Sequence, residues 1–194
     1  MSYADNKRIA KNTIYLYIRT FVSMIVALYT SGKILEALGV DDFGIFNVVG
    51  GIISLMSFIN GSMSVATQRY LTYELGRGTE GQFNKVFNMA VYIHAIIAVI
   101  VLIAAETMGV WFVNTQLSIP EVRMEAANWV FQATILTTIL GILQTPYNAA
   151  IISHEHMHVY AYVGLGETFA KLFIVWGLFY YPYDRLAIWG FAIF

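Results

Sequence analysis

The sequence predicts an all-α protein, built as a polytopic bundle of transmembrane helices. Of its 194 residues, 58% are hydrophobic and only 12% are charged, whereas an ordinary soluble domain carries about 25% charged residues. The mean hydropathy is +0.64. So few polar side chains do not cover the surface of a soluble fold of this size, and a membrane protein is therefore expected.

Long apolar segments predict five membrane spans and the start of a sixth. A helix needs about 20 mostly apolar residues to cross the hydrocarbon core of a bilayer. The predicted spans cover about residues 12–38, 43–69, 86–113, 126–152 and 159–180, and a last apolar run covers residues 186–194. Because this run is too short to cross a membrane, we expect the chain to be the N-terminal fragment of a longer protein.

Glycine and proline mark the ends of several predicted spans. The stretch GVDDFG, residues 39–44, is expected to form the turn between the first two spans. Pro120 suits the first turn of the helix that forms the fourth span. Pro146 lies inside that span and predicts a kink or a local break.

The distribution of basic residues predicts a cytoplasmic N-terminus, because loops on the cytoplasmic side of a membrane are enriched in lysine and arginine. With this orientation, six basic residues flank the inner ends of the spans: Lys7, Arg8, Lys11, Arg69, Arg77 and Lys85. Only Arg123 and Arg185 then flank outer loops.

Four of the predicted spans carry polar or small residues on one helical face. On the first span these are Asn12, Tyr15, Arg19, Ser23, Thr30 and Lys33. The corresponding residues are Asn47, Gly51, Ser54, Gly61 and Gln68 on the second span, Thr134, Thr137, Gly141, Thr145 and Asn148 on the fourth, and Gly164, Glu167 and Lys171 on the fifth. Such stripes predict a bundle around a hydrated cavity. Alternatively, the small residues only allow close helix packing.

Charged residues within the spans are candidates for a functional role, because a charge at membrane depth is costly and usually faces a bundle interior. Arg19 lies eight residues after Lys11, about 12 Å deeper along a helix. Its side chain either reaches back to the cytoplasmic interface or lines the cavity and binds an anion. Glu167 and Lys171 form either a mutually neutralising pair or part of a transport pathway.

The stretch HEHMH, residues 154–158, matches the H-E-x-x-H pattern of zinc metalloproteases. A zinc site needs both outer histidines on one helical face and a third ligand. The stretch lies between two spans, and neither Glu167 nor Asp184 is a convincing third ligand. We therefore expect an ordinary cytoplasmic turn, with a zinc membrane protease that uses His154, Glu155 and His158 as the alternative.

Other classes of function find no support in the sequence. There is no cysteine, and no phosphate-binding Walker A motif is present. The net charge of −1 gives no basic face for nucleic acid. We expect no enzymatic activity, no cofactor and no metal.

Three motifs carry a resemblance to a known family. They are LG-x-x-x-FG-x-F (residues 38–46) and ATQRYL…ELGRG (residues 66–78), both in the region Leu38–Gly78, and TPYNAAIISHE (residues 145–155). In these motifs the chain resembles bacterial O-antigen and capsular polysaccharide flippases of the multidrug/oligosaccharidyl-lipid/polysaccharide exporter superfamily. The resemblance implies a MATE-like transporter with two six-helix lobes, of which this chain supplies the N-terminal lobe with an incomplete sixth helix.

The resemblance also implies a cargo and a location. The cargo is a polyprenyl-pyrophosphate-linked oligosaccharide, moved across the bacterial inner membrane by alternating access, with Na⁺ or H⁺ as a possible coupling ion and with membrane lipids and polysaccharide-assembly proteins as partners. Arg19 is the first candidate for the pyrophosphate and Arg69 the second, and the polar stripes add Asn47, Gln68, Asn148, Glu167 and Lys171. The alternatives are a drug exporter of the same superfamily and a non-transporting scaffold of a polysaccharide-assembly complex.

Overall fold

The computed structural model describes residues 3–54, 57–180, 186 and 189–190, and this part of the chain consists of helices and short turns without a β-strand. The all-α prediction is therefore confirmed. The α-helices are α1 (Tyr3–Ser54), α2 (Ser57–Gly76), α3 (Phe83–Ala104), α4 (Val110–Thr115), α5 (Glu121–Ser153) and α6 (Met157–Leu178). A 3₁₀ turn, Gly78–Glu80, precedes α3, and a π-helical turn, Ala105–Gly109, joins α3 to α4.

Four helical stretches are long and apolar enough to cross a membrane: Ile9–Ile52, Phe83–Thr115, Glu121–Ser153 and Met157–Leu178. The predicted second span is helical where the structure describes it, within α1 and α2, but α2 is not among these four stretches. Most of the predicted sixth run, residues 186–194, and Arg185 lie outside the described residues. The structure thus confirms membrane-type helices, and the number of spans stays a prediction.

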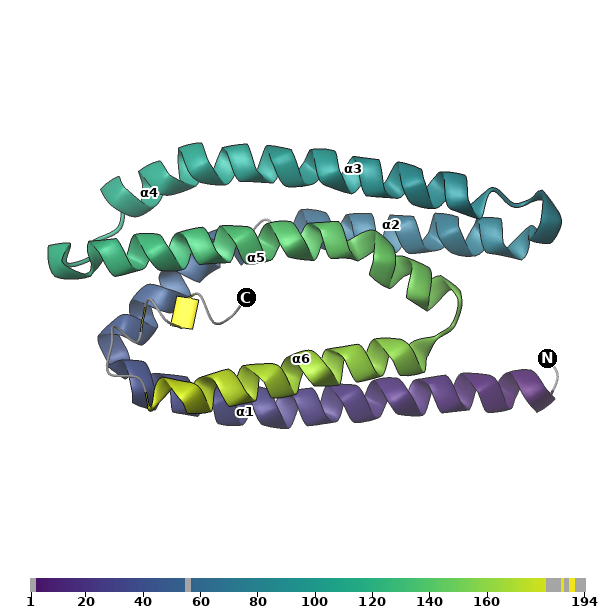
Figure 1. The fold of residues 1–194 in the computed structure, drawn as a ribbon, viewed down its shortest axis with the longest axis horizontal. Helices are drawn as coiled ribbons and strands as arrows, with labels where there is room; N and C mark the ends of the chain where they lie inside the picture. The colour runs from purple at the N-terminus through teal and green to yellow at the C-terminus, as the bar shows by residue number, and fades with distance from the viewer. Residues whose placement is uncertain (1–2, 55–56, 181–185, 187–188, 191–194) are drawn as a thin grey trace.

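The helices form two groups that lie side by side (Figure 1). The first part of α1 runs along α6 in the same direction, while α2 and α3 both pack against α5. The N-terminus, the α2–α3 turn and the α5–α6 turn lie at one end, which we call the N-terminal end. The bend in α1, the α4–α5 connection and the last turn of α6 lie at the opposite, distal end.

A single glycine reverses the course of α1 at the distal end. Gly39 has φ 78° and ψ 173°, and the helix resumes immediately after it. This combination of angles is essentially restricted to glycine. The predicted turn over residues 39–44 is therefore a one-residue break at its first position, followed by a helical arm, residues 40–54, that leads to α2.

Replacing Gly39 with alanine is expected to destabilise the protein by about 1–3 kcal/mol, the cost of a side chain in this backbone region. A Cβ on Gly39 would meet no atom within 4 Å, so backbone strain alone is tested. The measurement is the free energy of unfolding in a detergent titration followed by circular dichroism. Gly44→Ala is the matched control, because Gly44 is helical and equally open. Equal stability of the two variants would contradict this account.

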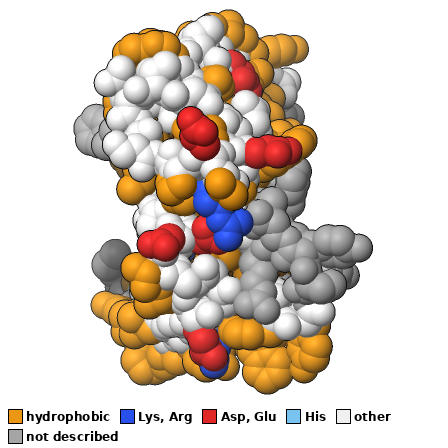
Figure 2. Space-filling model, turned by 90° about the vertical axis from the view of Figure 1, so that its left-hand side faces the viewer, with side chains coloured by type: hydrophobic (Ala, Val, Ile, Leu, Met, Phe, Trp, Pro, Cys, Tyr) orange, Lys and Arg blue, Asp and Glu red, His pale blue; other side chains and the backbone are white. Residues whose placement is uncertain are grey.

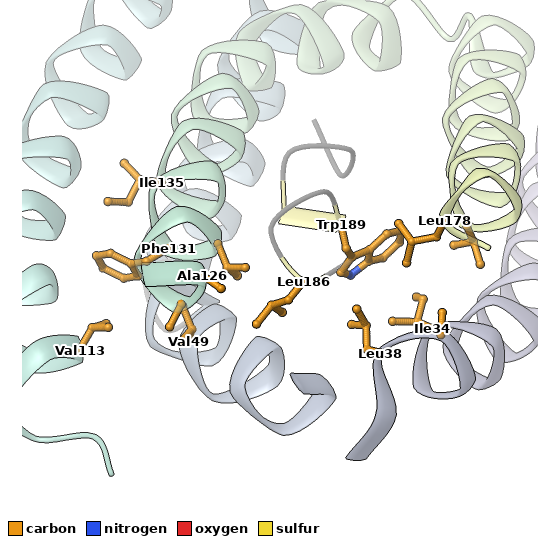
Figure 3. Packing of buried hydrophobic residues seen from close by; sticks show 14 of the residues in the cluster. Ile34, Leu38, Val49, Val113, Ala126, Phe131, Ile135, Leu178, Leu186 and Trp189 are labelled. Atoms are coloured by element: carbon orange, nitrogen blue, oxygen red, sulfur yellow. The ribbon is translucent and has the colours of Figure 1, made fainter. Parts of the chain in front are cut away.

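The main hydrophobic core lies at the distal end (Figure 3). Phe131 of α5 is completely buried there, and the Trp189 ring lies 6.0 Å from the ring of Phe46. The other labelled members of the cluster are Ile34, Leu38, Val49, Val113, Ala126, Ile135, Leu178 and Leu186. Packing of these side chains joins the arm of α1 to α5 and to the end of α6.

Charged groups are distributed unequally between the two ends. Acidic side chains are scattered over the distal end, with few basic ones among them (Figure 2). One of the acids, Asp42 in the arm of α1, is nearly buried and forms an ion pair with Arg123 of α5. The distance between Asp42 Oδ2 and Arg123 Nη2 is 3.0 Å. The predicted inner basic residues, Lys11, Arg69, Arg77 and Lys85 among them, belong to segments at the N-terminal end.

One irregularity lies in α5 and a second in the π-helical turn that packs against it. α5 itself continues through Pro146 and changes direction in its C-terminal part (Figure 1), so the prediction of a kink is confirmed and that of a break is wrong. In the π-helical turn, Gly109 lies against the ring of Phe131, and the Gln132 side chain donates a 3.1 Å hydrogen bond to Glu106.

Candidate functional site at the α1–α6 seam

The polar stripe of α1 packs against α6 along its N-terminal half. Asn12 donates a 3.4 Å hydrogen bond to the backbone carbonyl of Glu155, just before α6. The hydroxyls of Ser23 and Thr168 lie 3.0 Å apart, and the rings of Tyr15 and Tyr162 lie 6.2 Å apart with edge-to-face geometry. We call this contact, with the Arg19 region described next, the α1–α6 seam.

Arg19 lies in the middle of the seam. Its guanidinium carbon is 4.4 Å from the centroid of the Tyr160 ring, which places the cation on the negative face of an aromatic ring. The guanidinium also fills the space beside Gly164, where a Cβ would overlap it. The Nε atom is buried and has no hydrogen-bond partner in the described structure. Only glycine at position 164 leaves room for this arrangement.

The charge of Arg19 is not neutralised within the described part of the chain. The ion pairs of these residues join Lys33 to Glu36, Arg77 to Glu74, and Arg123 to Asp42, and none includes Arg19. A half-buried cation without a counter-ion is costly. Its planar fork of N–H donors fits the oxygens of a phosphate group. The seam therefore has the chemistry of an anion-binding site.

The sequence left two positions open for the Arg19 side chain, which either reaches back toward the membrane interface or lies inside the bundle. The structure shows features of both. Tyr160 and Gly164 lie in the first two turns of α6, within about 10 Å of its start. The side chain is thus near the N-terminal end of the bundle. It is nevertheless held between two helices by Tyr160 instead of extending freely toward the end of α1.

The structure bears on two of the polar stripes. The stripe of the first span packs against α6, where its hydroxyl, amide and aromatic groups find partners, and the hydrated cavity stays a prediction. Glu167 and Lys171 are both exposed, and no ion pair joins them in the described structure. The predicted neutralising pair is therefore not formed in the described structure.

The other predicted site residues lie on the arm of α1 and on α2 and α5 of the second helix group. Asn47 is exposed and donates a 2.7 Å hydrogen bond to the carbonyl of Phe43. Arg69 is exposed and lines a hollow of about 560 Å³ with Ser62, Tyr70 and Tyr73. Gln68 of α2 and Asn148 of α5 are half-buried. Among the described contacts, none joins Arg19 to these four residues.

Tyr160 is the site residue that sequence reasoning missed. A signal for it existed, because Tyr160 lies four residues before Gly164 and so belongs to the same helical face as Gly164, Glu167 and Lys171. An aromatic residue near the end of a span, however, is more often an interfacial anchor. Its contact with Arg19 depends on how α1 and α6 are paired, and the sequence of either helix alone does not contain that information.

The histidine stretch forms a turn, as predicted, and does not form one helix. α5 ends at Ser153, Glu155 has a φ of 57°, and α6 begins at Met157. His154 and His158 therefore belong to different helix ends, and the helical face that an H-E-x-x-H site requires is interrupted. The His154 ring packs edge-on against Phe83, at 4.9 Å. Within the described residues no group of three potential ligands is placed to hold a metal ion.

The fold and the site define a helical protein whose long apolar segments suit a membrane. Comparisons of the chain with protein-family models, with curated proteins and with solved structures found no match.

Proposed function

We propose that this chain forms the N-terminal lobe of a MATE-like flippase. Its cargo is a polyprenyl-pyrophosphate-linked oligosaccharide, which alternating access moves from the cytoplasmic to the outer leaflet of the bacterial inner membrane. The observation that carries the proposal is Arg19, a sheltered cation without a counter-ion in the described structure, near the N-terminal end of the α1–α6 pair. The sequence motifs of residues 38–78 and 145–155 support the same conclusion.

In this proposal Arg19 binds the pyrophosphate of the cargo. The Tyr160 ring and the backbone of Gly164 hold the guanidinium in place, so little side-chain entropy is lost when the anion binds. The polyprenyl chain stays in the hydrocarbon region beside the outer face of α1, where Ile14, Ile18 and Phe21 are exposed. Lipid and phosphate thus occupy neighbouring faces of one helix.

In this proposal, polar residues of the α1 arm and of the second helix group contact the saccharide part of the cargo. Asn47, Gln68 and Asn148 offer amide groups for sugar hydroxyls, and Arg69 supplies a second cation at the entrance. Glu167 and Lys171 lie on α6, further from the cytoplasm than Arg19. The basic residues at the N-terminal end support a cytoplasmic N-terminus, and Na⁺ or H⁺ remains the proposed coupling ion.

The test is transport by the full-length protein in proteoliposomes. A fluorescent polyprenyl-pyrophosphate oligosaccharide is placed in both leaflets, and a membrane-impermeant quencher is added outside. Protein-dependent loss of the protected fluorescence is expected. Efflux of a cationic dye without movement of the saccharide lipid would favour the drug exporter, and the absence of both activities from a folded protein would favour the scaffold.

A further inference from the structure

A small hollow lies between α1 and the end of α6, at the distal end of the protein and far from Arg19 (Figure 1). Its volume is about 250 Å³. Residues of both helices line it: Tyr29, Lys33, Glu36, Trp176, Phe179 and Tyr180. Aromatic rings and two opposite charges therefore meet in one place, which we call the distal hollow. The proposed function does not use it.

The two charged groups of the distal hollow form an ion pair that keeps room for a ligand. Lys33 Nζ donates a 2.6 Å hydrogen bond to Glu36 Oε2 and lies 5.7 Å from the centroid of the Phe179 ring. An ammonium group has three N–H donors and a carboxylate has several acceptor positions. The Lys33 side chain is 36% exposed and that of Glu36 is 60% exposed. The hollow thus offers a cation and an anion, side by side, to one ligand.

The distal hollow lies at the level expected for lipid head groups. α6 has 22 residues, a length of about 33 Å, and the hydrocarbon core of a bilayer is about 30 Å thick. When α6 spans a bilayer, its last turn therefore lies at the surface, where tryptophan and tyrosine are enriched. Lys33 of α1 shares this level, because its ammonium group lies beside the Phe179 ring.

Apolar side chains continue both walls of the distal hollow toward the middle of the protein. On α1, Ile25 lies one turn before Tyr29 and is 51% exposed. On α6, Phe173 lies one turn before Trp176 and is 73% exposed. Residues three or four positions apart share a helical face, so these side chains extend the walls. The whole surface matches a ligand that has a charged head and hydrocarbon chains.

We propose that the distal hollow binds a zwitterionic phospholipid whose head group carries an N–H ammonium ion, as in phosphatidylethanolamine. The phosphate accepts a hydrogen bond from Lys33, and the head-group ammonium donates one to Glu36. The acyl chains lie against Ile25 and Phe173. An anionic head group is disfavoured, because Glu36 repels its negative charge. This inference goes beyond the flippase proposal and depends on neither its cargo nor its direction.

The test is photocrosslinking of the full-length protein in phosphatidylcholine nanodiscs. The probes are phosphatidylethanolamine and phosphatidylglycerol with the same photoreactive acyl chain, and mass spectrometry locates the labelled peptides. Phosphatidylethanolamine is expected to label residues 25–36 and 169–180 about threefold to tenfold more than phosphatidylglycerol, the effect of one charged hydrogen bond at a partly screened surface. Equal labelling by the two probes would overturn the proposal. Loss of the labelling in an excess of methyl glucoside would identify a sugar site instead.

Two acidic residues separate the distal hollow from a general effect of surface charge. Glu36→Gln removes the acceptor of the head-group ammonium, so the preference for phosphatidylethanolamine is expected to disappear. Glu125→Gln is the matched control, because Glu125 is an exposed acid at the distal end, in the first turns of α5. The preference is a ratio measured on folded protein, so a lower yield of one variant does not imitate its loss. An equal effect of the two substitutions would overturn the proposal.

Two tryptophans separate the distal hollow from an ordinary aromatic belt. Trp176 is 56% exposed, and Trp111 of α4, also at the distal end, is 57% exposed. Trp176→Ala removes a wall of the hollow, and labelling of residues 25–36 by phosphatidylethanolamine is expected to fall severalfold. Trp111→Ala is expected to leave it unchanged, and equal labelling in the two variants would contradict a built site. Because no transport is measured, either result leaves the flippase proposal to its own test.

Discussion

Arg19→Ala is expected to reduce transport of the saccharide lipid by about tenfold to a hundredfold. A hydrogen bond to a charged group contributes about 1.5–3 kcal/mol, and the guanidinium is the sheltered cation of the α1–α6 seam. The measurement is the initial rate of quenching in proteoliposomes, with the amount of folded protein matched by size-exclusion chromatography. Arg19→Lys keeps the charge but loses the planar fork, so an intermediate rate is expected.

Lys11→Ala is the matched control for this prediction. Lys11 lies eight residues earlier on α1, is exposed, and has its Nζ 5.9 Å from the Tyr15 ring. The substitution removes one positive charge from the same end of the protein without altering a contact of Arg19, and a change of less than about twofold is expected because exposed charges are screened. Equal transport rates for Arg19→Ala and the unmodified protein would show that Arg19 does not bind the cargo.

Gly164→Ala is expected to destabilise the seam by about 1 kcal/mol, the low end of the cost of an added group in a packed site, because the atoms it displaces are the end of a flexible side chain. The new Cβ overlaps the guanidinium of Arg19, which must leave the Tyr160 ring. Unfolding is followed by circular dichroism during a detergent titration, and transport is measured on the same preparation. We expect both stability and transport to fall.

Gly166→Ala provides the control within the same helix. Gly166 is exposed, and a Cβ there would meet no atom within 4 Å. The double variant Arg19→Ala with Gly164→Ala is expected to recover part of the lost stability, because the overlapping groups are then absent together and the two effects are not additive. Identical unfolding of Gly164→Ala and Gly166→Ala would show that the close contact does not matter.

Much of the fold was predictable because it depends on local properties of the sequence. Long apolar segments identify membrane-type helices, and the stretch GVDDFG, residues 39–44, predicts the turn that begins at Gly39. The extent of that turn was less accessible, because residues 40–51 (VDDFGIFNVVGG) are weak helix formers. The helix there is supported by packing of side chains such as Phe46 and Val49 in the core. The π-helical turn at Ala105–Gly109 has no comparable signal in the sequence, and its last residue, Gly109, lies against the ring of Phe131 from another helix.

The site was predictable only in part. Periodicity showed that Arg19 shares a face with Tyr15 and Ser23, but the spacing of polar residues does not reveal what that face contacts. In the structure the face contacts α6, and Tyr160 becomes the partner of Arg19. For Glu167 and Lys171 the spacing predicted a contact that is not made. The two residues are four positions apart on α6, as an ion pair requires, but their side chains are exposed and form no ion pair with each other.

The position of the core at the distal end has a mechanical consequence. Side chains of α1, α5 and α6 interlock there, whereas the other hydrophobic cluster of the described residues joins only α3 to α5. A tilt of the α1–α6 pair relative to α2, α3 and α5 would therefore have its fulcrum near Gly39. Arg19 lies twenty residues from that point, a lever of about 30 Å, so that a tilt of about 10° displaces it by about 5 Å. The unpaired cation is thus placed far from the fulcrum, where a small rotation produces a large displacement.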